Sequence, residues 1–175
     1  MHSFIANTYT YIGEVYQNLQ EHQKALESYL KALDIQKSVY GERLHYTIVS
    51  SYNGLGSVYE SLGEHEKAIE HRMKALEIKK SIYGESSVRV TESLHDLAGA
   101  YRKFLEYEKA LECYFEAIEI RKLNNQENDL WGAAIYNGMG LTYYQFRDYP
   151  KAIEYFTKAL GIKKHIDGET YSQTL

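Results

Sequence analysis

The sequence predicts an all-α fold, an α-solenoid in which antiparallel helix pairs follow one another along the chain. Three observations support this prediction. One pattern recurs four times, in stretches that start at Tyr9, Tyr52, Leu94 and Tyr136. Each copy contains two segments in which apolar residues recur at helical spacing. The 175-residue chain also contains a single proline, which disfavours frequent breaks in helices. Repeats that start at such intervals along a chain are typical of stacked helix pairs.

The composition excludes several classes of protein. Hydrophobic residues make up 44% and charged residues 25%, as in ordinary globular proteins. The net charge of −4 gives no reason to expect a nucleic-acid partner. The single cysteine, Cys113, cannot form an internal disulfide, which favours a reducing compartment. No apolar run approaches the ~20 residues of a membrane span, and residues 1–9 lack the pattern of a signal peptide. We therefore expect a cytoplasmic protein with no membrane association.

The recurring columns divide the chain into repeats. We expect a single array over 1–175, and each repeat is a first helix, a turn and a second helix. In repeat two, Tyr52, Leu55 and Tyr59 form the apolar stripe of the first helix. Ala68 and Ala75 lie on the second helix, and glycine or polar residues separate the two helices. The predicted repeats occupy residues 5–41, 45–84, 87–125 and 129–168.

The helix ends carry recognisable signals. Asn124 and Asn125 are expected to end the second helix of repeat three. Pro150 fits the first turn of the last second helix, with Asp148 as its cap. The other second helices are predicted to end at glycines in the left-handed conformation: Gly41, Gly84 and Gly168.

Small residues and tyrosines occupy fixed columns. Glycine in the middle of a helix costs about 1 kcal/mol relative to alanine, so its recurrence implies a closely packed neighbouring helix. The small first-helix residues are Gly13, Gly56, Ala98 and Gly140. Tyrosines at a nearby column are expected to fill the space between the two helices of a pair: Tyr16, Tyr59, Tyr101 and Tyr143. This packing accounts for much of the excess of tyrosine, 18 residues in all.

These columns resemble the tetratricopeptide repeat (TPR), and the resemblance covers nearly the whole chain. Arg72 departs from it, because Tyr29, Tyr114 and Phe156 occupy that column in the other repeats. The closing proline of the family is absent throughout. The standard repeat has about 34 residues, and the longer unit found here resembles the repeats of kinesin light chains. The segments after each Gly-Glu lack the His-Pro-Asp sequence of those relatives, so the chain is not identified as a kinesin light chain.

The resemblance implies a right-handed superhelix whose first helices line a concave groove, and a non-catalytic scaffold that binds a peptide or helix of a partner protein there. Helical phase gives the residues expected to face this groove. The candidates are Asn7, Thr10, Glu14, Asn18, Asn53, Ser57, Glu60, Glu92, His95, Arg102, Lys103, Asn137, Leu141 and Tyr144. For each of them the alternative is a solvated helix face.

Two kinds of groove residue carry recognition chemistry. The amides of Asn7, Asn53 and Asn137 can pair with a peptide backbone through one donor and one acceptor. Arg102 and Lys103 form a basic spot for an acidic group. In the family's clamp for a carboxyl terminus, several repeats supply cations. Here only repeat three does so, and that mode is therefore disfavoured.

No catalytic, metal or cofactor site is predicted. The Gly-x-Gly segments at 54–56 and 138–140 lie inside predicted helices, not in a phosphate-binding turn. The seven histidines show no ligand spacing. Cys113 is expected to be packed, not reactive.

Residues 169–175 match the opening of a further repeat and are expected to be the start of a truncated fifth one. Self-association through an uncapped last repeat is therefore an open possibility. Two alternatives to groove binding stay open as well: an oligomerisation or spacer module that stacks end to end, and a regulatory TPR segment of a larger signalling protein.

Overall fold

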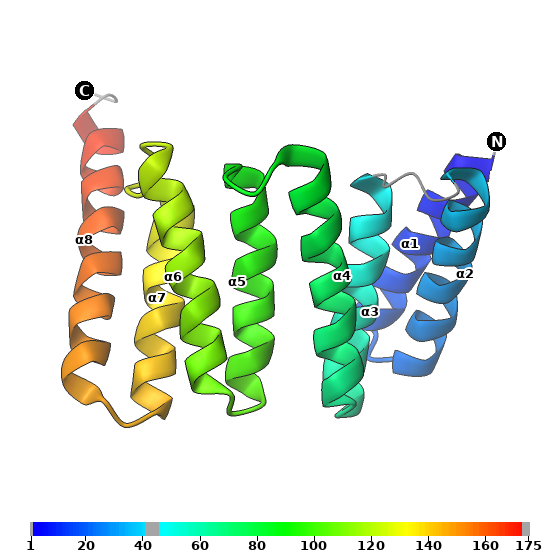
Figure 1. Ribbon diagram of the computed structural model, residues 1–175, viewed down its shortest axis with the longest axis horizontal. Helices are drawn as coiled ribbons and strands as arrows, with labels where there is room; N and C mark the ends of the chain where they lie inside the picture. Colours follow the sequence, from blue (N-terminus) through cyan, green and yellow to red (C-terminus); the bar gives the residue numbers. More distant parts are fainter. Residues whose placement is uncertain (1, 41–45, 173–175) are drawn as a thin grey trace. The chain divides into compact units, whose positions relative to one another are not determined.

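The computed structural model describes the backbone of residues 2–40 and 46–172 and the side chains up to residue 168. Within these ranges the chain forms eight α-helices and no strand (Figure 1). They are α1 (His2–Asn18), α2 (His22–Tyr40), α3 (Tyr46–Leu62), α4 (His65–Tyr83), α5 (Val88–Lys103), α6 (Tyr107–Leu123), α7 (Leu130–Gln145) and α8 (Tyr149–Ser172).

The helices form two compact units, residues 1–85 and 86–175. In unit 1, α1 pairs with α2, α3 pairs with α4, and α3 also packs against both α1 and α2. Unit 2 repeats this scheme with α5 to α8. The prediction of helix pairs is thus confirmed, while a single continuous array stays a prediction.

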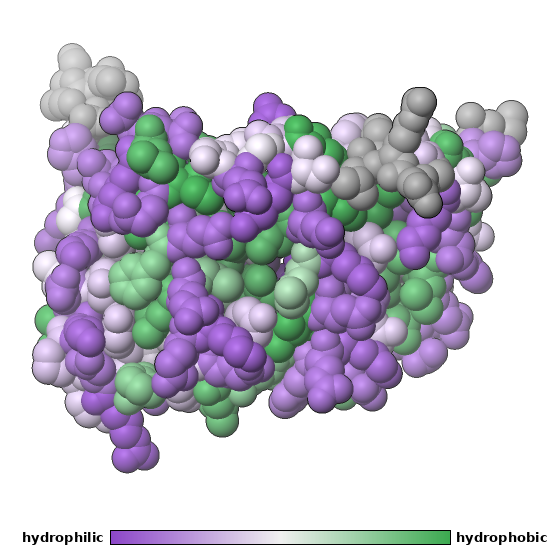
Figure 2. Space-filling model, in the orientation of Figure 1, coloured by the Kyte–Doolittle hydropathy of each residue, from purple (hydrophilic) through white to green (hydrophobic). Residues whose placement is uncertain are grey.

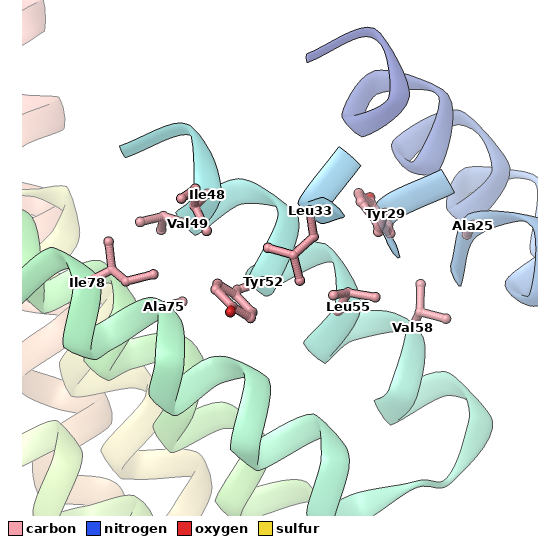
Figure 3. Close-up of a cluster of buried hydrophobic side chains, with 10 residues drawn as sticks. All are labelled: Ala25, Tyr29, Leu33, Ile48, Val49, Tyr52, Leu55, Val58, Ala75 and Ile78. Atoms are coloured by element: carbon pink, nitrogen blue, oxygen red, sulfur yellow. The ribbon is translucent and has the colours of Figure 1, made fainter. Parts of the chain in front are cut away.

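The core of unit 1 lies between its first and second helices (Figure 3). Leu55 and Val58 of α3 are fully buried against residues of α2 such as Tyr29 and Leu33. Hydrophilic side chains cover much of α4, as Figure 2 shows. Burying an apolar side chain such as Leu55 or Val58 contributes about 1.5–3 kcal/mol, so the interface between α2 and α3 supplies much of the stability of the unit.

The mid-helix glycines lie where a second-helix side chain presses on a first helix. A Cβ atom on Gly13 would come within 2.8 Å of the Tyr29 ring, and one on Gly140 within 2.7 Å of Phe156. The alanines of the second helices are equally tight, since Ala25 and Ala68 have no exposed surface. The predicted close approach of helices is therefore confirmed.

The tyrosines of the first helices have two partners. Tyr59 packs on the His71 ring at 5.1 Å between centroids, and Tyr143 stacks on Tyr155 at 5.4 Å. Each tyrosine of this column also lies beneath a lysine of its own second helix, at 5.0–5.5 Å from nitrogen to ring centroid. The expected filling between paired helices is confirmed, and the cation–π contacts are an addition that the sequence analysis did not anticipate.

The helix ends agree with the sequence at all but one of the described positions. Gly84 ends α4 with a φ of 84°, but its ψ of 151° lies outside the left-handed helical region, and its N–H donates to the carbonyl of Lys80. Asn125 has a φ of 55° after α6. The Asp148 carboxylate accepts a hydrogen bond from the N–H of Lys151 at 3.2 Å. The prediction at Gly168 is wrong, because α8 continues to Ser172. A glycine costs about 1 kcal/mol in a helix but does not prevent it. The predicted end at Gly41 lies outside the described residues.

Candidate functional site

The candidate residues all lie on the first helices of the two units, α1, α3, α5 and α7. We call the side of these helices that the second helices leave exposed the first-helix face. In unit 1, Glu14 and Asn18 of α1 are exposed and Asn7 is half-buried. A hollow of about 160 Å³ lies between α1 and α3. Its lining consists of Asn7, Thr10, Tyr11, Glu14, Tyr46, Thr47 and Ser50. The structure therefore brings three of the predicted residues together, with two tyrosines that the sequence analysis did not select.

Thr10 is part of the packing between α1 and α3. It is 6% exposed, and its hydroxyl donates to the carbonyl of Ala6 at 3.2 Å and shares a hydrogen bond of 3.1 Å with Ser51. It forms the floor of the hollow. A role as an exposed ligand contact does not fit this position.

Glu60 and Ser57 belong to a buried polar network. The Arg72 guanidinium donates to the Glu60 carboxylate at 2.6 Å and to the Ser57 hydroxyl at 3.1 Å. The side chains of Arg72 and Glu60 are only 9% and 6% exposed. These two candidates therefore stabilise α4 against α3, and little of the Glu60 side chain faces solvent.

The column of Glu60 has the same role in two other repeats. In repeat one, the Tyr29 hydroxyl donates to the Gln17 side chain at 3.0 Å, and burial raises the pKa of Tyr29 to about 12, so the donor keeps its proton at neutral pH. In repeat three, burial raises the pKa of Tyr114, and the adjacent Arg102 offsets part of that rise. A first-helix residue thus satisfies the polar second-helix residue of its own repeat. The departure of Arg72 from the aromatic column was a signal for this pairing.

Unit 2 presents a different surface. Glu92, Lys103, Asn137 and Tyr144 are exposed, while His95, Arg102 and Leu141 are half-buried. His95 packs edge-on against the rings of Tyr114 and Trp131, with centroids 5.6 and 6.0 Å apart. Trp131 was not among the predicted residues. The first helices of unit 2 are therefore more basic than those of unit 1, because α1 and α3 contain no lysine or arginine.

Two candidate residues have polar atoms whose hydrogen bonding is incomplete within the described residues. The Oδ1 atom of Asn53 and the Nε atom of Arg102 are buried and have no partner there. Arg102 does use another nitrogen, which donates to Gln145 at 3.4 Å. Asn7 and Asn53 lie on neighbouring helices of one unit, whereas Asn137 belongs to the other unit.

A larger cavity of about 530 Å³ lies away from the candidate residues, where the end of α6 meets α7 and α8. Its charged groups already have partners. Lys122 pairs with Glu119, Lys158 pairs with Glu154, and the hydroxyl of Tyr136 donates to Glu127. The two lysines are thus neutralised by neighbouring carboxylates, while Glu127 keeps its charge and accepts a hydrogen bond from a neutral hydroxyl.

Other chemistry finds little support in the described part of the chain. No group of three or more His, Cys, Asp or Glu residues there could hold a metal ion. No helix in the same ranges is long and apolar enough to cross a membrane. Gly54 and Gly138 lie inside helices against Tyr29 and Tyr114, as expected of packing glycines. Cys113 is half-buried on α6.

The comparison with known families decides the identity of the fold. The tetratricopeptide repeat profile matches residues 4–53, 47–123 and 107–165. The chain belongs to the tetratricopeptide repeat family. TPR proteins generally act as protein–protein interaction scaffolds. No curated protein matches the chain in sequence.

Solved structures agree with this assignment. BtubC (BKLC) from P. vanneervenii matches with a TM-score of 0.78 and 24% identity over 94% of this chain, which spans 64% of that protein. A candidate kinesin light chain from Podosopora anserina with nearly identical TPR-like repeats gives 0.78 and 18% identity, covering 92% of this chain and 76% of that one. MamA matches with a TM-score of 0.66 and 22% identity, over 93% of this chain and 81% of that one. The predicted all-α TPR fold and the likeness to kinesin light chain-type repeats are confirmed.

Proposed function

We propose that this TPR chain is a non-catalytic scaffold that binds a peptide or helix of a partner protein along its first-helix faces. The main support is the hollow between α1 and α3, where Asn7 and Glu14 meet exposed side chains of both first helices. The second helices do not cover this surface. Solenoid repeat proteins use extended surfaces of this kind to bind partners.

The chemistry of the two faces fits a bound main chain. The amides of Asn7 and Asn137 each offer a donor and an acceptor, the pair of groups that a peptide unit also has. Tyr144 and Trp131 are 58% and 43% exposed and add apolar contact area on unit 2. Rigid aromatic side chains with polar groups beside them are typical of protein interfaces. We assign the chain no cofactor, and the cytoplasm stays our prediction for its location.

The test is selection from a display library of random peptides with the whole chain. A triple variant, Asn53→Ala, Arg102→Ala and Asn137→Ala, is compared with a matched one on second helices, Asp34→Ala, Glu77→Ala and Glu112→Ala. We expect the wild type and the second-helix variant to enrich a common motif that the triple variant loses. Enrichment of the same motif by all three proteins would contradict binding at these faces.

End-to-end assembly is a second candidate, and one observation favours it. Val15 of α1 is 57% exposed, although Val58 in the same column of α3 is fully buried beneath α2. On α8, Leu160 is 52% exposed, whereas its counterpart Leu33 is 5% exposed. The exposed surfaces of α1 and α8 thus carry apolar residues equivalent to those that pack together between α2 and α3 inside unit 1. Light scattering over a range of concentrations tests this function, and a Val15→Asp variant is expected to abolish any rise in mass.

A further inference from the structure

The hollow of unit 1 has room for the end of one long side chain. Its volume of about 160 Å³ is that of about five water molecules at ~30 Å³ each. It lies between α1 and α3, which pack side by side within the unit (Figure 1). Tyr11 and Tyr46 line it and are 65% and 61% exposed, so their rings are accessible to a ligand.

Among the residues that the structure describes, the charge at this place is negative and uncompensated. Neither α1 nor α3 contains a lysine or an arginine, and their carboxylates are Glu14 and Glu60. Arg72 neutralises Glu60. Glu14 is exposed, and no ion pair joins it to any residue that the structure describes. Of the described residues that line the hollow, it is the only charged one. By contrast, α5 in unit 2 contains Arg89, Arg102 and Lys103.

A carboxylate between accessible tyrosine rings favours a cation. Lysine and arginine bind over aromatic faces, and the contact is stronger where water is partly excluded. The same helices show this geometry on their other side, where Lys31 lies 5.8 Å from the Tyr9 ring centroid and Lys74 lies 6.0 Å from that of Tyr52. A carboxylate adds a charge-assisted hydrogen bond, which is about twice as strong as a neutral one.

We propose that this hollow is the subsite that takes an arginine or lysine side chain of the bound peptide. Glu14 is its counter-ion, and the rings of Tyr11 and Tyr46 are its walls. Asn7 and Ser50 accept hydrogen bonds from the remaining N–H groups. Arginine is favoured over lysine, because its planar guanidinium stacks on rings and donates in several directions at once. This proposal rests on the function proposed above and adds the chemistry of the partner.

Selection with two carboxylate variants tests it. Glu14→Gln removes the charge and keeps the shape, while Glu77→Gln makes the same change at an exposed carboxylate of the second helix α4 and is the matched control. We expect the wild-type motif to contain an arginine or lysine at one fixed position. Glu14→Gln should bind that peptide about tenfold more weakly, the equivalent of 1.4 kcal/mol, and Glu77→Gln should bind it as the wild type does. A motif without a basic residue, or equal affinity of Glu14→Gln for it, would overturn the proposal while leaving peptide binding intact.

If no peptide is enriched, that result counts against the proposed function itself. A second measurement tests the subsite independently of the selection. The ¹⁵N-labelled chain is titrated with N-acetyl-arginine amide, and with N-acetyl-glutamine amide as the neutral control. We expect shifts at Asn7, Tyr11 and Ser50 with the arginine compound alone, and their loss in Glu14→Gln. Shifts that are the same for both compounds, or that persist in the variant, would overturn the subsite.

Discussion

The pair of Arg72 and Glu60 offers the sharpest test of how the helices of unit 1 are held together. Its atoms lie 2.6 Å apart, and both side chains are less than a tenth exposed. Breaking a pair at such depth leaves an uncompensated charge and costs about 3–5 kcal/mol, against about 0–1 kcal/mol for a surface pair. We therefore expect Glu60→Ala to lower the free energy of unfolding by about 3–5 kcal/mol, measured by urea denaturation followed by circular dichroism.

Two further variants separate burial from charge. The exposed pair of Lys158 and Glu154 is the matched control, and Glu154→Ala should cost no more than about 0.5 kcal/mol. The double variant Glu60→Gln and Arg72→Tyr copies the hydrogen-bonded pair of Gln17 and Tyr29, and it should recover at least half of the loss. A cost below about 1 kcal/mol for Glu60→Ala would show that the pair is solvated and would refute this account of the network.

Three other predictions concern stability. Burial lowers the pKa of His71 below its ordinary 6.5, so the unfolded chain binds the proton more readily. The contribution of neutral His71 to the stability is therefore fully present above about pH 6.5. It is lost as the pH falls toward the lower pKa that His71 has in the folded chain. In His71→Ser, the melting temperature should depend less on pH between 7.5 and 5.5, and an unchanged dependence would contradict this assignment. Leu105 is 66% exposed with a φ of 64°, where Gly63 stands in repeat two. Leu105→Gly should stabilise the chain by about 0.5–1 kcal/mol in urea denaturation, because the left-handed conformation costs a branched residue about 1–2 kcal/mol; a loss of stability would count against this reasoning. Ala68→Leu should cost about 1–3 kcal/mol by overpacking α4 on α3, and an unchanged melting temperature would mean that Ala68 is not at the interface.

Most of the fold could be predicted from the sequence because each repeat carries the same packing requirements. Alanine and glycine columns mark where helices touch, and residues such as Ala25 and Gly13 lie at those contacts. The helix end at Gly168 was missed because a glycine lowers helical stability without ending a helix. The positions of residues along a helical pattern do not show whether the helix continues in spite of that cost.

The candidate site could be predicted only in outline. Phase correctly placed Glu14, Asn18 and Asn137 at the surface. It also selected Glu60. The pattern does not tell a polar residue that faces solvent from one that faces a buried guanidinium, because both have the same position in a helical repeat. Tyr46 was missed because tyrosine in this chain is mostly a packing residue, and its exposure depends on the local neighbours of α3.

Chemical-shift mapping of the most enriched library peptide on the ¹⁵N-labelled chain tests the central claim most directly. The account predicts that the perturbed amides lie on α1, α3, α5 and α7, with Asn7, Glu14 and Asn137 among them. Perturbation of the outward sides of α2, α4, α6 and α8, with the first helices unaffected, would contradict it.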